Sequence, residues 1–418
     1  MRRFLILMSL FLLSCSGDKK FDNKNYKMIF GTEKHLDVKR DKNFVDDKDL
    51  QKIDIEFVKS DKGYSGDVFS NIDINKDGIF FVNGGYVLYS YLPNLKFNKK
   101  VTMKLSDKWK VSNVFVSSDK YNIYVLFDFG KLIVFDKNTF EKQYELQLNN
   151  TFNTKPVSDG FYLFLKASDS SVYSLFPEDG KLLWTYKPEP ISTSYKSVGP
   201  ILLSEGYLIS SNGLDSLVIL NKSNGDAVYS ASKNDESVNF KNDLTKQFNL
   251  FNFENDKILQ KNVLNDNDTF DYFYTLAFNG LSIKKFDSFK SDGLFLNDNF
   301  SSVVSFKNGF LISDNICGVS FLNFKTKALN DLFYFKTKDG EVCNLKISSF
   351  YDGLKYYSFV YQDNLYLMKG VENGELYEIG VLVKNKKTKI KDVEYLESFN
   401  ENVYIFSNGY IYKNEDIN

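Results

Sequence analysis

Four segments of the chain can be laid over one another, and this repeat limits the fold more than any other feature. Each segment has an apolar strand, a short turn, a second apolar strand, a turn rich in Asp, Asn, Gly or Pro, and a third strand. Successive starts lie 44, 38 and 46 residues apart, at Gly78, Asn122, Gly160 and Gly206. A short β-rich unit that recurs at this period must bury its apolar faces against neighbouring copies.

The apolar pattern within the repeat favours the blades of a β-propeller. In "IYVLFDF", which starts at Ile123, alternate residues point to one face, yet Tyr124 and Leu126 make the opposite face apolar as well. Strands of this kind must be covered on both sides. Blades stacked around an axis provide that cover, whereas a two-layer sandwich would show cleaner alternation. A repeat of about 40 residues with four short strands is typical of a propeller blade.

Weaker copies downstream bring the total to eight, and they begin near Phe273, Gly309, Gly353 and Asn402. The last copy lacks an outer strand, which the segment Lys52–Ser60 can supply. We therefore predict an all-β fold, a β-propeller of four-stranded antiparallel blades, with eight blades closed by an N-terminal strand. This single domain is expected to cover residues 51–418, with a polar insertion at about 232–271. Seven blades are the alternative, because the insertion obscures the fifth copy.

The N-terminus has the pattern of an export signal that ends at a lipidation site. Two arginines precede ten mostly apolar residues, 4–13, a run too short to span a bilayer as a helix. The tetrapeptide Leu-Leu-Ser-Cys, which ends at Cys15, resembles the bacterial lipobox, in which the cysteine is lipidated. We predict a signal peptide over residues 1–14 and lipid attachment at Cys15. An ordinary signal with an incidental cysteine is the alternative.

The segment after the cysteine predicts a flexible, membrane-anchored tether. Residues 15–50 are charged, rich in asparagine and without sustained periodicity. A multiply acylated cysteine gives stable anchoring. Ser16 rather than Asp follows Cys15, which by resemblance to enteric sorting rules favours the bacterial outer membrane. We expect the periplasmic face rather than the cell surface.

Composition argues against charged partners and against most catalysis. The chain has 53 basic and 54 acidic residues, so no net field gathers nucleic acid or a membrane surface. The single histidine, His35, lies in the expected tether, which excludes Ser-His-Asp and Cys-His catalytic groups and makes zinc sites built on several His or Cys residues improbable. We expect no catalytic residues, no metal and no cofactor.

Three further patterns have two interpretations each. The segment Asp73–Gly78 matches half of a calcium loop, but Phe81 and Gly84 stand where such loops need an acid, so a polar turn between strands is favoured over calcium. Cys317 and Cys343 can form a disulfide or remain buried thiols, and the thiols are favoured because a closed propeller needs no staple. The acidic run 265–271 is expected to be a solvated loop, with a contact to a basic partner as the alternative.

One copy carries a more specific resemblance. The segment "VYSLFPEDGKLLWTYK" is similar to the PQQ-type propeller repeat, with Asp179 and Gly180 in the turn and Trp184 shortly after it. In that family the tryptophan is thought to dock between neighbouring blades, and the glycine takes a positive φ. A neighbouring copy keeps Gly225 but has Tyr229 in the tryptophan position. Another keeps Asp136 and has Tyr144, without the glycine.

Two exported families share this type of propeller. Quinoprotein dehydrogenases resemble one another in a vicinal cysteine pair and a tryptophan floor, whereas this chain has separated cysteines and only Trp109 and Trp184. Length, tether and lipobox instead resemble the B-component lipoprotein of the outer-membrane β-barrel assembly machinery, which binds the barrel insertase through loops. This resemblance implies a non-enzymatic scaffold for envelope proteins. A surface-exposed lipoprotein that binds a host or environmental ligand is the alternative, and a propeller enzyme with an acidic channel site is a third class.

Overall fold

The structure is a computed structural model, and it describes most of the chain beyond residue 50. The described residues are 51–53, 57–105, 110–188, 201–203, 206–211, 217–231, 248–253, 256–264, 269–277, 282–290, 300–306, 309–314, 318–323, 328–334, 346–352, 355–362, 364–370, 377–382, 390, 393–399 and 402–414. Every regular element in these ranges is a β-strand. No helix among the described residues has the length and hydrophobicity needed to cross a membrane.

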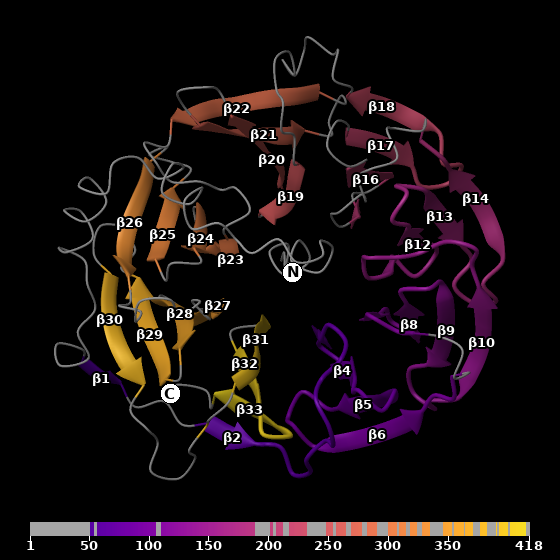
Figure 1. The fold of residues 1–418 in the computed structure, drawn as a ribbon, viewed down its shortest axis with the longest axis horizontal. Coiled ribbons are helices and arrows are strands. Elements are labelled where there is room, and N and C mark those ends of the chain that lie inside the picture. The colour runs from indigo at the N-terminus through magenta and orange to yellow at the C-terminus, as the bar shows by residue number, and fades with distance from the viewer. Residues whose placement is uncertain are drawn as a thin grey trace. The chain divides into compact units, whose positions relative to one another are not determined.

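One compact unit comprises Ser60–Leu250 and Asn279–Leu281. Each run of four consecutive strands forms one antiparallel sheet, and Figure 1 shows these runs from indigo to magenta. The strands are β3 (Asp73–Asn75), β4 (Gly78–Val82), β5 (Val87–Tyr91), β6 (Phe97–Thr102), β7 (Val114–Ser118), β8 (Asn122–Phe127), β9 (Lys131–Asp136), β10 (Lys142–Gln147), β11 (Val157–Ser158), β12 (Leu163–Lys166), β13 (Val172–Leu175), β14 (Leu182–Tyr186), β15 (Leu202–Leu203), β16 (Tyr207–Ser211), β17 (Leu217–Asn221) and β18 (Ala227–Ala231).

The other compact unit comprises Met1–Lys59, Phe251–Phe278 and Ser282–Asn418, and the boundary between the units falls within β19. It contains the remaining sheets, again in chain order apart from two N-terminal strands. The strands are β1 (Gln51–Ile53), β2 (Phe57–Lys59), β19 (Phe248–Phe253), β20 (Asp256–Leu264), β21 (Thr269–Ala277), β22 (Ser282–Lys290), β23 (Phe300–Phe306), β24 (Gly309–Asp314), β25 (Gly318–Asn323), β26 (Ala328–Tyr334), β27 (Lys346–Asp352), β28 (Lys355–Gln362), β29 (Asn364–Gly370), β30 (Tyr377–Leu382), β31 (Val393–Phe399), β32 (Asn402–Ser407) and β33 (Tyr410–Asn414).

The predicted all-β fold of four-stranded antiparallel sheets is confirmed. The described strands form eight sheets: seven have four strands, and the sheet of β27–β30 has β1 as a fifth strand. The N-terminal segment supplies two strands rather than one: β1 pairs in parallel with β30, and β2 pairs antiparallel with β33, with Phe57 opposite Asn414. The sheet of β31–β33 thus receives its fourth strand from the N-terminal region. The number of blades in one ring and the closure of that ring stay predictions.

Most predicted copies start at the second strand of a sheet, but the fifth does not. The copies at Gly78, Asn122, Gly309 and Asn402 coincide with the starts of β4, β8, β24 and β32. Phe273, in contrast, lies inside β21, the third strand of its sheet. Residues 248–253 and 256–264, which the sequence placed in a polar insertion, form β19 and β20 of that sheet. Residues 232–247 lie outside the described part of the chain.

The core of the unit from Ser60 to Leu250 lies between neighbouring sheets. All six residues of β8 are buried, as expected for a strand that is apolar on both faces. One apolar cluster joins β4 and β5 to β7, β8 and β9, and another joins β12 and β13 to β16 and β17. Burying a valine or phenylalanine side chain contributes about 1.5–3 kcal/mol, so these clusters stabilise the stacking of the sheets.

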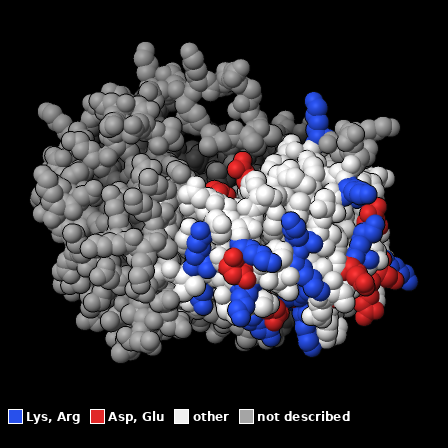
Figure 2. Space-filling model, turned by 90° about the horizontal axis from the view of Figure 1, so that it is seen from below, with Lys and Arg blue, Asp and Glu red and all other residues white. Residues whose placement is uncertain are grey.

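In the sheets of β3–β6, β7–β10 and β11–β14, the last strand is the most exposed one. The side chains of β6 and β10 are either exposed or partly buried, and both strands contain lysines. β14 carries no charge, and its Leu182 and Leu183 are 52 % and 41 % exposed. On the face that Figure 2 shows, basic and acidic side chains of the described residues are interspersed, in keeping with the balanced composition.

Candidate functional site: turns that join neighbouring sheets

Trp184 joins its sheet to the next one, as the repeat resemblance predicts. From β14, its indole Nε1 donates a hydrogen bond to the carbonyl oxygen of Lys222 at 2.9 Å. The ring also covers Gly225, where an added Cβ would lie 2.6 Å from a ring carbon. Gly225 has a φ of 77°, which suits glycine and lets the turn approach the indole closely. The predicted docking role of Trp184 is confirmed.

Tyr144 makes the equivalent contact one sheet earlier. Its hydroxyl donates to the carbonyl oxygen of Pro177 at 2.9 Å, and its ring lies against Gly180. Burial raises the pKa of Tyr144, because the charged phenolate would lose its hydration. Tyrosine therefore keeps both parts of the tryptophan contact, namely a flat ring over a glycine and a donor to a main-chain carbonyl.

Lys99 occupies the same position in the preceding sheet, and the sequence did not reveal it. Its amine donates to the carbonyl oxygens of Asn138 and Thr139, at 2.8 and 3.2 Å. The turn that receives it has Phe140 at a φ of 64°, where the following turns have glycine. The only available clue was the position of Lys99, three residues after the turn that precedes its strand, as for Trp184.

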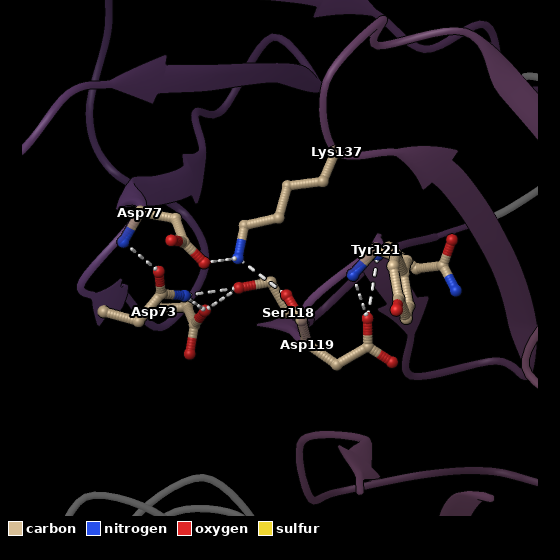
Figure 3. A network of polar contacts seen from close by, with 8 residues as sticks. Asp73, Asp77, Ser118, Asp119, Tyr121 and Lys137 are labelled. Atoms are coloured by element: carbon tan, nitrogen blue, oxygen red, sulfur yellow. Dashed lines mark hydrogen bonds and ion pairs between the residues drawn. The ribbon is translucent and has the colours of Figure 1, made fainter. Parts of the chain in front are cut away.

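A second set of contacts lies at the turns between the first two strands of neighbouring sheets, and Figure 3 shows the contacts around the β3–β4 and β7–β8 turns. The amine of Lys137 lies 2.8 Å from Asp77 Oδ2 and donates to the carbonyl oxygen of Asp119 at 2.6 Å. The Lys137 side chain is only 6 % exposed, whereas that of Asp77 is 42 % exposed. This lysine therefore ties the sheet of β3–β6 to the sheet of β7–β10.

The segment Asp73–Gly78, which half-matches a calcium loop, lies at the turn between two strands. β3 and β4 form a hairpin in which Asn75 pairs with Gly78. Asp73 Oδ2 accepts a hydrogen bond from Ser118 Oγ at 2.5 Å, and Asn75 Nδ2 donates to the same hydroxyl at 2.6 Å. The Asp73 carboxylate therefore binds a residue of β7 in the neighbouring sheet. Across the described part of the chain, no three metal-ligating side chains are grouped as a metal site would need.

Asp119 braces the turn between β7 and β8. Its Oδ1 accepts the backbone N–H groups of Tyr121 and Asn122, each at 2.8 Å. Its Oδ2 accepts from the Tyr124 hydroxyl at 2.6 Å and from Ser158 Oγ, in the next sheet, at 2.7 Å. Burial, and then the Asp119 charge, raise the pKa of Tyr124. Both carboxylate oxygens are thus occupied by hydrogen bonds.

Asp159 repeats this arrangement between β11 and β12. Its Oδ1 accepts the N–H groups of Phe161 and Tyr162, both at 3.0 Å. Its Oδ2 lies 3.0 Å from the amine of Lys222, in the following sheet. Asp119 and Asp159 therefore each shape one turn and bind a neighbouring sheet.

One buried lysine has no counterpart in the sequence predictions. Lys166, at the end of β12, is fully buried. Burial lowers the pKa of Lys166 to about 7, because the ammonium form loses its hydration. A charged group at this depth was not expected, since lysines are almost never fully buried.

The remaining predicted residues lie outside the described ranges. They are Cys15, the tether with His35, Cys317, Cys343 and residues 265–268 of the acidic run. Trp109 also lies outside them. The lipid attachment at Cys15 and the state of the two later cysteines stay predictions.

Comparisons with known proteins agree with this architecture. A sequence profile of PQQ-type repeats, described as outer membrane protein assembly factor BamB, matches residues 100–248. No curated protein sequence matches the chain.

Many solved structures share the fold, and two of them illustrate the likeness. The crystal structure of BamB from Moraxella catarrhalis aligns with a TM-score of 0.53 and 12 % identity, over 87 % of this chain and 99 % of that one. The computationally designed Ika8 protein aligns with a TM-score of 0.55 and 9 % identity, over 86 % of this chain and 99 % of that one. The chain is therefore similar to outer membrane protein assembly factor BamB, in sequence over residues 100–248 and in fold over most of its length.

Proposed function

We propose that this chain is a lipid-anchored, non-enzymatic scaffold for protein–protein interaction in the bacterial envelope, and an accessory factor in outer-membrane β-barrel assembly. The match of residues 100–248 to the BamB profile carries this proposal. The propeller fold and the lipobox at Cys15 support it. The partners are envelope proteins of the barrel assembly machinery.

The contacts between sheets suit a scaffold. Lys137, Asp119 and Asp159 each hold a turn and a neighbouring sheet at once. A partner that binds such braced turns does not have to order them, so less conformational entropy is lost on binding than with a mobile loop. The same carboxylates are engaged in hydrogen bonds and ion pairs, which favours a structural role over acid–base chemistry.

Affinity purification of the native lipoprotein from solubilised envelopes tests the function. We expect the barrel insertase to be recovered in a fixed ratio, and an unrelated envelope lipoprotein carrying the same tag to recover none. Repeated absence of the insertase would refute the assembly role. Protease treatment of intact cells decides the location: protection fits the periplasmic face, whereas cleavage within the propeller would favour the surface-exposed alternative.

Metabolic labelling with palmitate tests the anchor. The wild-type chain is expected to incorporate label and to fractionate with the outer membrane. Cys15→Ala should abolish both. Ser14→Ala keeps a small residue before the cysteine, so it should remain labelled. Equal labelling of Cys15→Ala and the wild type would rule out Cys15 as the attachment site.

A further inference from the structure

We propose that Tyr121 and Phe161 are the aromatic anchors of a docking surface for a protein partner whose apolar pocket has an acidic rim. This inference rests on the proposed scaffold function and names the chemistry of its partner. Tyr121 is 54 % exposed and Phe161 is 77 % exposed. They stand at equivalent positions, in the turns between the first two strands of neighbouring sheets.

The two turns share a short pattern. Ser118 and Asp119 lead to Tyr121, and Ser158 and Asp159 lead to Phe161, with one residue between acid and aromatic. The residues that follow turn inward, since Asn122 is buried and Tyr162 stacks on Phe164 with ring centroids 5.8 Å apart. In each turn, one aromatic side chain is therefore exposed, whereas the side chain of the next residue packs toward the core.

Each exposed aromatic is held by a rigid backbone. The N–H groups of Tyr121 and Phe161 bind the Oδ1 atoms of Asp119 and Asp159. The second oxygen of each acid is fixed by another sheet, through Ser158 or through Lys222. Figure 3 shows Asp119 facing the backbone of Tyr121 in this arrangement. A preorganised aromatic gives a binding partner contact area at low entropic cost.

The aromatic chemistry points to a protein pocket. Phe161 has no polar atom that water can hydrate, and its exposed ring adds little to the core. Fully burying such a ring is worth about 1.5–3 kcal/mol, and aromatic residues dominate the energetically important positions of protein interfaces. Phe161 is thus fitted to a dry pocket, and Tyr121 to a site whose edge can also accept a hydrogen bond.

The charges beside the aromatics define the rim. Lys120 is exposed beside Tyr121, and its amine lies over the Tyr121 ring, 4.8 Å from the ring centroid. Lys76 is exposed on the turn between β3 and β4. Within the described residues, neither lysine takes part in an ion pair. The acids Asp77 and Asp159 are already paired with Lys137 and Lys222. The charges left for a partner on these turns are therefore basic, and complementarity calls for carboxylates around the partner's pocket.

Site-specific photo-cross-linking in intact cells tests this surface. A benzoylphenylalanine residue is placed at 121, at 161 or, as a control, at 182, an exposed apolar position on β14. We expect adducts from positions 121 and 161 with one protein, mapped to an apolar segment flanked by Asp or Glu. The control position should give none. Lys120→Glu should lower the adduct yield from position 121 about tenfold.

Several results would overturn the inference: no adduct at 121 or 161, equal adducts at 182, a cross-linked segment without acidic neighbours, or an adduct with lipid or glycan. As a second measurement, Phe161→Ser should reduce recovery of the cross-linked protein by about tenfold, since that factor corresponds to about 1.4 kcal/mol. Leu182→Ser should leave recovery unchanged. If the cross-linked partner is not the insertase, the assembly role is refuted and the docking surface is supported. If the Phe161→Ser variant still recovers the insertase fully, the docking surface is refuted and the assembly role is supported.

Discussion

At the scale of single residues, position in the repeat decides the role more than residue type does. Trp184, Tyr144 and Lys99 differ in shape and charge. Each nevertheless donates a hydrogen bond from the last strand of its sheet to a carbonyl oxygen in a turn of the following sheet. The tryptophan was predictable because it matches a known repeat. The lysine was not, since lysines on outer strands usually serve to keep sheet edges apart.

Gly225 offers a test of the docking contact. Gly225→Ala should destabilise the protein by about 1–2 kcal/mol through its positive φ, and by about 1–3 kcal/mol more because the new methyl group meets the Trp184 ring. Gly160→Ala is the matched control. Its φ of 91° is also positive, but no atom lies within 4 Å of an added Cβ. Denaturant unfolding measures both free energies, and equal losses would show that the ring contact is unimportant.

Lys166 makes stability depend on pH. Between its folded pKa of about 7 and its ordinary value of 10.5, the unfolded chain binds a proton that the folded chain does not. The free energy of unfolding should therefore rise with pH across this window, by about 1 kcal/mol per unit from this group. Lys166→Met should remove that slope. Unfolding of both proteins at pH 7.5 and 9.5 measures it, and parallel pH dependences would contradict the assignment.

At the scale of elements, the ties between neighbouring sheets are unequal. Lys137 is buried and serves Asp77 and the Asp119 carbonyl, so Lys137→Ala should cost about 1–3 kcal/mol of unfolding free energy. Lys142 pairs with Glu145 at 2.9 Å, but both side chains are exposed. Lys142→Ala should therefore change stability by less than about 0.5 kcal/mol. Similar losses in the two variants, measured by chemical denaturation, would mean that Lys137 is not a tie.

The strands themselves were predictable where they are short and apolar on both faces. All residues of β4 and β8 are buried, and the starts of both strands were placed correctly. The strand β20 was not predicted, because its sequence "DKILQKNVL" mixes charged and apolar residues over nine positions. Such a mixture is typical of a polar connection between strands. The contacts of the candidate site were missed for another reason: Asp159 and Lys222 form an ion pair only because neighbouring sheets stack, and the two residues lie 63 positions apart in sequence.

At the scale of the whole molecule, strands from the N-terminal and the C-terminal regions of the chain contribute to one sheet. β2 pairs with β33, which also pairs with β32. Deleting residues 410–418 should leave β2 and β32 with unpaired edges and expose the segment around Phe57 to proteases. Deleting only 415–418 keeps β33 and is the control. Limited proteolysis with mass spectrometry locates the cuts, and identical patterns for both deletions would argue against this pairing.

The three docking donors all end on main-chain oxygens, of Asn138, Pro177 and Lys222. A carbonyl is present whatever amino acid occupies the position. Substitutions in the turns that accept these hydrogen bonds can therefore accumulate without removing the hydrogen bond between successive sheets. Such a fold tolerates deep divergence between its copies, and searches that rely on the tryptophan hallmark alone will overlook relatives built in the same way.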